Sequence, residues 1–203
     1  MDMPVKAQVE CLDGMYGQEI CLIINPATRF VTHVVVEDEH EPEIQYLVPL
    51  DELKLSTPHL IQLRCTTYEL RQMPRFVHIT YEHRTLPAIY PPEIYLSGVA
   101  AIMEEVAVPI THEQVPEGEL AVHQGAQVEA KDGHLGQLDE FLLDPTTKQI
   151  DYLVFREHHL WHHEELIVSA SQIEQIKDDK IYLKSDKQTI EQMQSAAAHA
   201  HGE

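Results

Sequence analysis

The sequence predicts a mainly β protein made of two tandem small antiparallel β-barrels, each with a short C-terminal helix, joined by a strap rich in proline and tyrosine. Three observations lead to this prediction. A block of residues occurs twice, apolar and polar residues alternate within it, and each copy carries an Asp-Gly pair where a tight turn is expected.

The repeat is clearest at the start of each copy. Residues 7–18 read AQVECLDGMYGQ and residues 126–137 read AQVEAKDGHLGQ, with eight of twelve positions identical. NPATR later matches DPTTK, and LIQLRCTTYELRQM matches KIYLKSDKQTIEQM. We therefore predict one barrel over 1–73, a Pro-rich linker over 74–122, and a second barrel with a helical tail over 123–203.

The predicted elements follow in the same order in both copies. Alternating Ala7, Val9 and Cys11 indicate a first strand. The Asp13-Gly14 pair indicates a hairpin, because glycine adopts positive φ without strain. A second strand ends at Asn-Pro or Asp-Pro, where the Asx side chain caps the turn. Three shorter strands and a short helix complete each copy, and the absence of helices between strands favours antiparallel pairing.

These motifs resemble the PRC-barrel family. The pattern is D-G-x-x-G-Q, an apolar strand, [ND]-P-x-T, a Val-rich strand and V-P or V-S before the next strand, with an HLW loop in the second copy. The resemblance covers about 7–73 and 123–193. It implies a small β-barrel related to the cytoplasmic domain of the photosynthetic reaction centre H subunit and to the C-terminal domain of the ribosome maturation factor. In those relatives the barrel is a docking module.

Charge limits the classes of partner. The net charge is -20, with 14 Lys and Arg against 34 Asp and Glu. Nucleic acids and anionic lipids would be repelled, so we expect neither as a partner, and cationic or mixed-charge protein surfaces are favoured. No signal peptide or membrane-spanning run is recognised, which predicts a cytoplasmic protein. Three cysteines without a CxxC motif indicate reduced thiols. The protein partner is not identified, and a homodimer is compatible with the sequence.

The linker is expected to be an ordered strap, because it alternates apolar residues with prolines. An alternative is that it orders only on a partner. Residues 97–106 are compatible with one or two helical turns. Tyr90 and Tyr95 are candidate protein-contact residues.

The stretch EHHLWHHEEL, residues 157–166, has the densest candidate chemistry. It offers His158, His159, His162, His163, Glu164 and Glu165 as transition-metal ligands. The corresponding loop of the first copy has one histidine, so a solvated hairpin tip is the favoured interpretation, and a proton sensor is a third. Trp161, with Leu160, is the best candidate for a protein contact. No other cofactor is expected.

Two further chemistries are disfavoured. No cysteine recurs between the copies, so thiol catalysis is not expected of the module. The acidic run 37–43 lacks the frame of a calcium-binding loop. The sequence thus favours a non-enzymatic protein-binding or scaffold protein. The alternative is a metal- or pH-responsive regulator that uses the histidines at 158–163.

Overall fold

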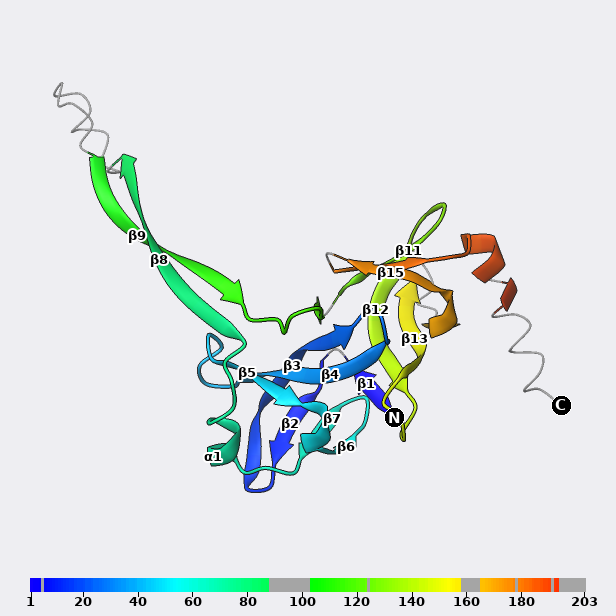
Figure 1. Ribbon diagram of the computed structural model, residues 1–203, viewed down its shortest axis with the longest axis horizontal. Coiled ribbons are helices and arrows are strands. Elements are labelled where there is room, and N and C mark those ends of the chain that lie inside the picture. Colours follow the sequence, from blue (N-terminus) through cyan, green and yellow to red (C-terminus); the bar gives the residue numbers. More distant parts are fainter. Residues whose placement is uncertain are drawn as a thin grey trace. The chain divides into compact units, whose positions relative to one another are not determined.

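The computed structural model describes residues 1–4, 6–87, 103–123, 125–157, 165–177, 179–190 and 192–193 (Figure 1). The chain is mainly β, as predicted. It divides into two compact units, one formed by Met1–Phe76 with Val115–Glu203 and the other by Val77–Gln114. No helix in the described residues is long and apolar enough to cross a bilayer.

The first sheet of the larger unit is built from residues of the first copy. Its main path has the strand order β5-β4-β3-β2-β7-β6. The strands are β2 (Gln8–Cys11), β3 (Gly14–Asn25), β4 (Phe30–Asp38), β5 (Gln45–Pro49), β6 (Leu53–Ser56) and β7 (Leu60–Leu63). A 3-10 turn, η1 (Leu50–Glu52), precedes β6, and helix α1 (Thr67–Leu70) follows β7.

The second sheet has the same order in the second copy, β14-β13-β12-β11-β16-β15. Its strands are β11 (Gln127–Ala130), β12 (Gly133–Leu143), β13 (Ile150–Glu157), β14 (Glu165–Ser169), β15 (Ile173–Lys177) and β16 (Lys180–Leu183). The turn η2 (Ala170–Gln172) precedes β15, and residues 187–190 are helical. Asp186 Oδ1 accepts a hydrogen bond from Thr189 N (2.8 Å) at the start of this helix.

The expectation of purely antiparallel pairing is wrong at one joint in each sheet. β2 pairs with β7 in parallel, and β11 pairs with β16 in parallel. The chain returns to the first strand only after passing through the other strands of its copy, which is long enough for a parallel connection. β6 and β15 were also not predicted. Among the described residues no ladder joins β5 to β6 or β14 to β15, so closure into a barrel stays a prediction.

The two copies exchange their leading strands. β1 (Asp2–Pro4), which precedes the first copy, pairs with β12 of the second. β10 (Leu120–His123), which precedes the second copy, pairs with β3 of the first. Met3 in β1 and Val122 in β10 are fully buried. The sheet of each copy therefore gains a strand that directly precedes the other copy in the sequence.

Further contacts connect the copies where β3 meets β4 and β12 meets β13. Phe30 and Gln149 form an antiparallel bridge, and Ile150 N donates to Arg29 O (2.9 Å). Buried apolar side chains of both copies, with Met3 and Val122, belong to one hydrophobic cluster. The copies therefore share a core instead of forming two separate ones.

The Asp-Gly pairs do more than turn the chain. Cys11 pairs with Gly14, so the two loop residues are Leu12 and Asp13, and Gly14 opens β3 with φ at 143°. The Asp13 carboxylate accepts from Thr67 N (2.8 Å) and from Thr67 Oγ1 (2.9 Å) at the start of α1. These bonds connect the hairpin to the helix.

The second copy repeats this arrangement. Asp132 Oδ1 accepts from Lys187 N (3.0 Å) where the second helix begins. In both copies the aspartate thus satisfies an N–H that the first turn of a helix leaves without a partner. The motif that signalled a hairpin therefore also fixes where the helix lies.

The Asx-Pro turns form as predicted. Asn25 Oδ1 accepts from Ala27 N and Thr28 N, both at 3.1 Å. Asp144 Oδ1 accepts from Thr146 N (2.8 Å) and from Thr147 N (2.7 Å). Arg29 and Lys148 then take positive φ, at 61° and 63°, before the next strand begins.

The smaller unit contains a two-stranded hairpin of β8 (Val77–Pro87) and β9 (Met103–Glu113). Its register runs over eleven pairs, from Val77 opposite Glu113 to Pro87 opposite Met103. The helical turns expected over 97–106 are wrong for the part the structure describes, because residues 103–106 are strand. The larger unit contains the rest of the predicted linker that the structure describes, including β10.

Glu19 on β3 is an exception within the core. It is 0% exposed, and neither carboxylate oxygen has a hydrogen-bond partner. Burial raises the pKa of this carboxyl well above its ordinary value and favours the neutral acid. The corresponding residue of the second copy is Leu138, which is also buried. The fold of a single copy is therefore compatible with an apolar side chain at this position.

We expect Glu19→Leu to raise the free energy of unfolding at neutral pH by about 1–3 kcal/mol, the usual cost of a buried polar group without a partner. The wild type should lose stability as the pH rises above about 4.3, because the unfolded chain releases a proton that folded Glu19 retains. Glu19→Leu should reduce this loss. Urea unfolding at several pH values measures both effects.

The matched control is Leu138→Glu, which makes the reverse change in the other copy. It should lower the free energy of unfolding and add a decline with rising pH. If Glu19→Leu instead destabilised the protein at every pH, the buried carboxyl would stabilise the fold, which would contradict the prediction.

Candidate functional site

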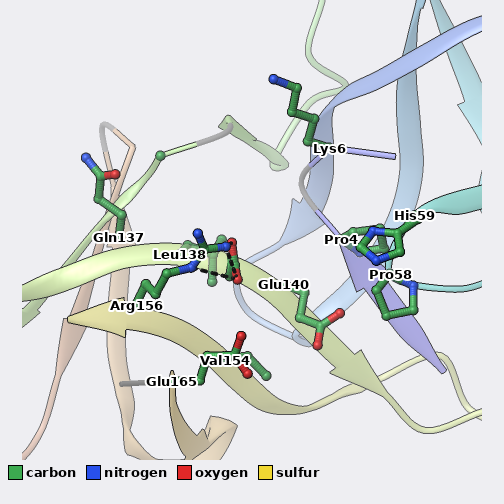
Figure 2. A pocket seen from close by; sticks show the side chains of 12 residues that line it. Pro4, Lys6, Pro58, His59, Gln137, Leu138, Glu140, Val154, Arg156 and Glu165 are labelled. Atoms are coloured by element: carbon green, nitrogen blue, oxygen red, sulfur yellow. Dashed lines mark hydrogen bonds and ion pairs between the residues drawn. The ribbon is translucent and has the colours of Figure 1, made fainter. Parts of the chain in front are cut away.

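A pocket of about 560 Å³ lies between the two copies (Figure 2). One wall comes from the first copy and the segment that precedes it, and the other from β12, β13 and β14. The lining residues are Pro4, Lys6, Pro58, His59, Gly125, Gln137, Leu138, Asp139, Glu140, Val154, Arg156 and Glu165. The pocket exists because β1 is paired to β12, which brings Pro4 against the second copy.

A bulge in β12 concentrates polar groups on one side of the strand. The β12–β13 register shifts between Leu138 and Glu140. A bulge interrupts the alternation of side chains between the two faces of a sheet. Leu138, Asp139 and Glu140 therefore all line the pocket although they are consecutive.

Arg156 and Asp139 form a two-pronged ion pair across β13 and β12. Arg156 Nε donates to Asp139 Oδ2 (3.2 Å), and Arg156 Nη2 donates to both carboxylate oxygens. This contact raises the pKa of the Arg156 guanidinium. Because its charge is already matched by Asp139, Arg156 adds little net positive charge to the pocket.

Glu140 is a carboxylate of the pocket with an oxygen that lacks a hydrogen-bond partner. Its Oε2 is buried without a hydrogen-bond partner. Burial, followed by the negative charges of Asp2, Asp139 and Glu165, raises the pKa of the Glu140 carboxyl. Figure 2 shows Glu140 between Arg156 and the wall formed by Pro4, Pro58 and His59. A cation placed here would restore the charged form of Glu140.

The opposite wall is mixed. Ser56 Oγ donates to Asp2 O and fixes β1 against the turn that contains Pro58 and His59. Lys6 is exposed and brings a positive charge to the same wall. With Arg156 and Asp139 paired, Glu140 and Glu165 outnumber Lys6, so the lining favours a ligand with a cationic group and an apolar part.

The predicted metal ligands are mostly outside the described residues. His158, His159, His162, His163 and Glu164 fall in the undescribed stretch 158–164, and the metal site there stays a prediction. Glu165 is the first residue of β14, exposed and part of the pocket lining. Within the part of the chain that the structure describes, no group of three or more His, Cys, Asp or Glu residues is arranged to hold a metal.

The predicted contact residues also lie outside the described part of the chain. They are Leu160, Trp161, Tyr90 and Tyr95, so their role as a protein-contact surface stays a prediction.

The cysteines and the acidic run have structural surroundings. Cys11, Cys21 and Cys65 are buried, reduced thiols. Burial raises the pKa of the Cys11 thiol to about 12, which disfavours the reactive thiolate. In the acidic run, Asp38 Oδ1 accepts from His40 N (2.9 Å) and Glu41 N (3.3 Å) and so closes a turn.

Sequence reasoning missed Lys6, Asp139, Glu140 and Arg156. A signal for Glu140 was present, because the first copy has Cys21 at the corresponding position, within the apolar run from Ile20 to Ile24. The signal was weak since a bulge changes which face a residue occupies, and bulges are not visible in an alternating pattern.

Comparison of the sequence with protein-family models and with curated proteins finds no match.

We expect Glu165→Gln to lower the pKa of Glu140, because it removes one of the negative charges that raise it. Carbon-detected NMR titration of the side-chain carboxyls measures this shift. Glu174→Gln, an exposed change on β15, is the matched control and should leave the Glu140 titration unchanged. An unaltered Glu140 pKa in Glu165→Gln would mean that these two carboxylates do not interact.

Proposed function

We propose that this chain is a non-enzymatic protein-binding scaffold built from two PRC-type barrel modules, and that the pocket between the copies receives a basic side chain of a partner protein. The observation that carries the proposal is the position of the pocket. Both copies line it, so a partner seated there would recognise the two-copy assembly and not a single module.

Both the net charge of the chain and the charges inside the pocket support a basic partner. The chain has a net charge of -20, which attracts cationic surfaces over long distances. Inside the pocket, Glu140 has a buried oxygen without a partner and Glu165 is close enough to influence it. A lysine or arginine side chain supplies donors for the carboxylates and an alkyl stem for Pro4, Pro58 and Val154.

The residues of the pocket also favour binding over catalysis. The lining contains carboxylates, a guanidinium already bonded to Asp139, one lysine and one histidine. Among the described lining residues there is neither serine nor cysteine, so the proposal includes no hydroxyl or thiol nucleophile and uses the carboxylates for binding.

Selection of random peptides displayed on phage tests this proposal. Wild-type protein should enrich peptides that carry lysine or arginine next to apolar residues. Their affinity for Glu140→Gln/Glu165→Gln should fall about tenfold, equivalent to ~1.4 kcal/mol. Isothermal titration calorimetry with a selected peptide measures the change.

Two controls separate the pocket from the overall charge. Glu43→Gln/Glu174→Gln removes the same charge from exposed positions away from the pocket lining and should retain wild-type affinity. Lys6→Gln removes the competing cation and should strengthen binding, whereas Lys54→Gln on β6 should not. If both glutamate double variants lost the same amount of affinity, the overall charge of the protein would explain the binding. The pocket would then be rejected as the site.

A further inference from the structure

The β8–β9 hairpin has the features of an incomplete sheet. Two-stranded ribbons are marginally stable alone and need further strands or a packed face. Among the described residues, β8 and β9 form ladders only with each other. Apolar side chains remain exposed on it, including Tyr81 at 66% and Ile79 at 38%.

Proline distinguishes the two edges of the hairpin. Pro109 lies in the middle of β9 and is paired with Tyr81. A proline within a sheet normally directs its nitrogen, which carries no hydrogen, away from the neighbouring strand. Pro109 therefore blocks the outer edge of β9. From Val77 to Leu86, β8 contains no proline, so its outer edge is the one able to accept another strand.

The same proline determines which β8 groups are available. If the nitrogen of Pro109 faces outward, Tyr81 and Pro109 form a pair without mutual hydrogen bonds, and the N–H and C=O of Tyr81 also face outward. Because antiparallel pairs alternate, the groups of Ile79 and His83 face outward with them.

A second β8 fits this edge in antiparallel orientation centred on Thr80. Thr80 then lies opposite Thr80 of the other copy, and Ile79 lies opposite Tyr81 twice. His78 lies opposite Glu82 twice, which matches opposite charges whenever the histidine is protonated. In this register, the outward-facing N–H and C=O groups of Ile79 form hydrogen bonds with those of Tyr81 in the other copy.

Charge distinguishes this register from its neighbours. Centring on Tyr81 places His78 opposite Arg84. Centring on Glu82 places two glutamates directly opposite each other, a destabilising like-charge pair. Centring on Ile79 keeps apolar residues opposite one another but lacks the His78–Glu82 match. Charge matching thus favours the register centred on Thr80.

We propose that two copies of this chain associate through the outer edges of β8 and form a four-stranded antiparallel sheet from two hairpins. Ile79 and Tyr81 of both copies then form one continuous apolar strip, which gives each hairpin the packing that it lacks alone. This inference does not depend on the pocket or on its proposed basic partner.

Disulfide cross-linking of the full chain tests the register. Thr80→Cys should form an intermolecular disulfide under mild oxidation, because opposed residues of neighbouring strands have Cβ atoms about 4.5–5.5 Å apart. Thr85→Cys, a threonine of the same strand that is more exposed than Thr80, should not, because this register does not place it opposite itself. The native cysteines are buried and give a common background. Equal cross-linking of both variants, or of neither, would overturn the proposal.

Charge exchange tests the interface without relying on one variant to fold. Glu82→Lys and His78→Glu should each weaken the dimer about tenfold, measured by sedimentation equilibrium. Mixing the two variants should restore association, because each altered residue then lies opposite a complementary one. A wild type that stays monomeric at all concentrations, or a mixture that associates no better than either variant, would overturn the proposal.

Discussion

The pairing of β1 with β12 and of β10 with β3 is the constraint on which the larger unit depends. Each pairing brings a strand from outside one copy onto the longest strand of the other. Met3 and Val122 are thereby fully buried in a hydrophobic cluster that includes both copies. Without this exchange the common cluster would lose Met3 and Val122, and the wall that Pro4 forms against the second copy would be missing.

Within that common frame the two copies have diverged at the positions that matter most chemically. Glu19 corresponds to Leu138, Cys21 corresponds to Glu140, and each pair occupies the same bulged segment of a long strand. One copy thus buries a carboxyl in the core, whereas the other directs a carboxyl into the inter-copy pocket. The two copies thus have the same strand order but different electrostatics at these two positions.

Local chemistry explains what could be predicted from the sequence. The Asp-Gly hairpins and the Asx-Pro turns depend on residues within five positions of one another, and the structure contains both in each copy. The mainly β class followed from the same signals.

Long-range pairing explains what could not be predicted. β1 has three residues and β10 has four, too few for a period to be recognised, and their partners lie in the other copy. The β2–β7 parallel pair is similarly invisible to local patterns. Of the candidate metal ligands, only Glu165 falls within the described residues, where it lines the pocket. Its neighbours Asp139 and Glu140 were missed because a bulge places them there.

The exchange of leading strands also sets an order for folding during synthesis. The edge of β3 that β10 covers is made early, but β10 itself emerges only after the β8–β9 hairpin has been translated. Ribosomes add about 5–20 residues per second, so the first copy spends seconds with an uncovered strand edge. Such an edge can pair with other nascent chains. Completion of the first copy therefore waits until β10 has been translated, which couples the folding of the two copies within the larger unit.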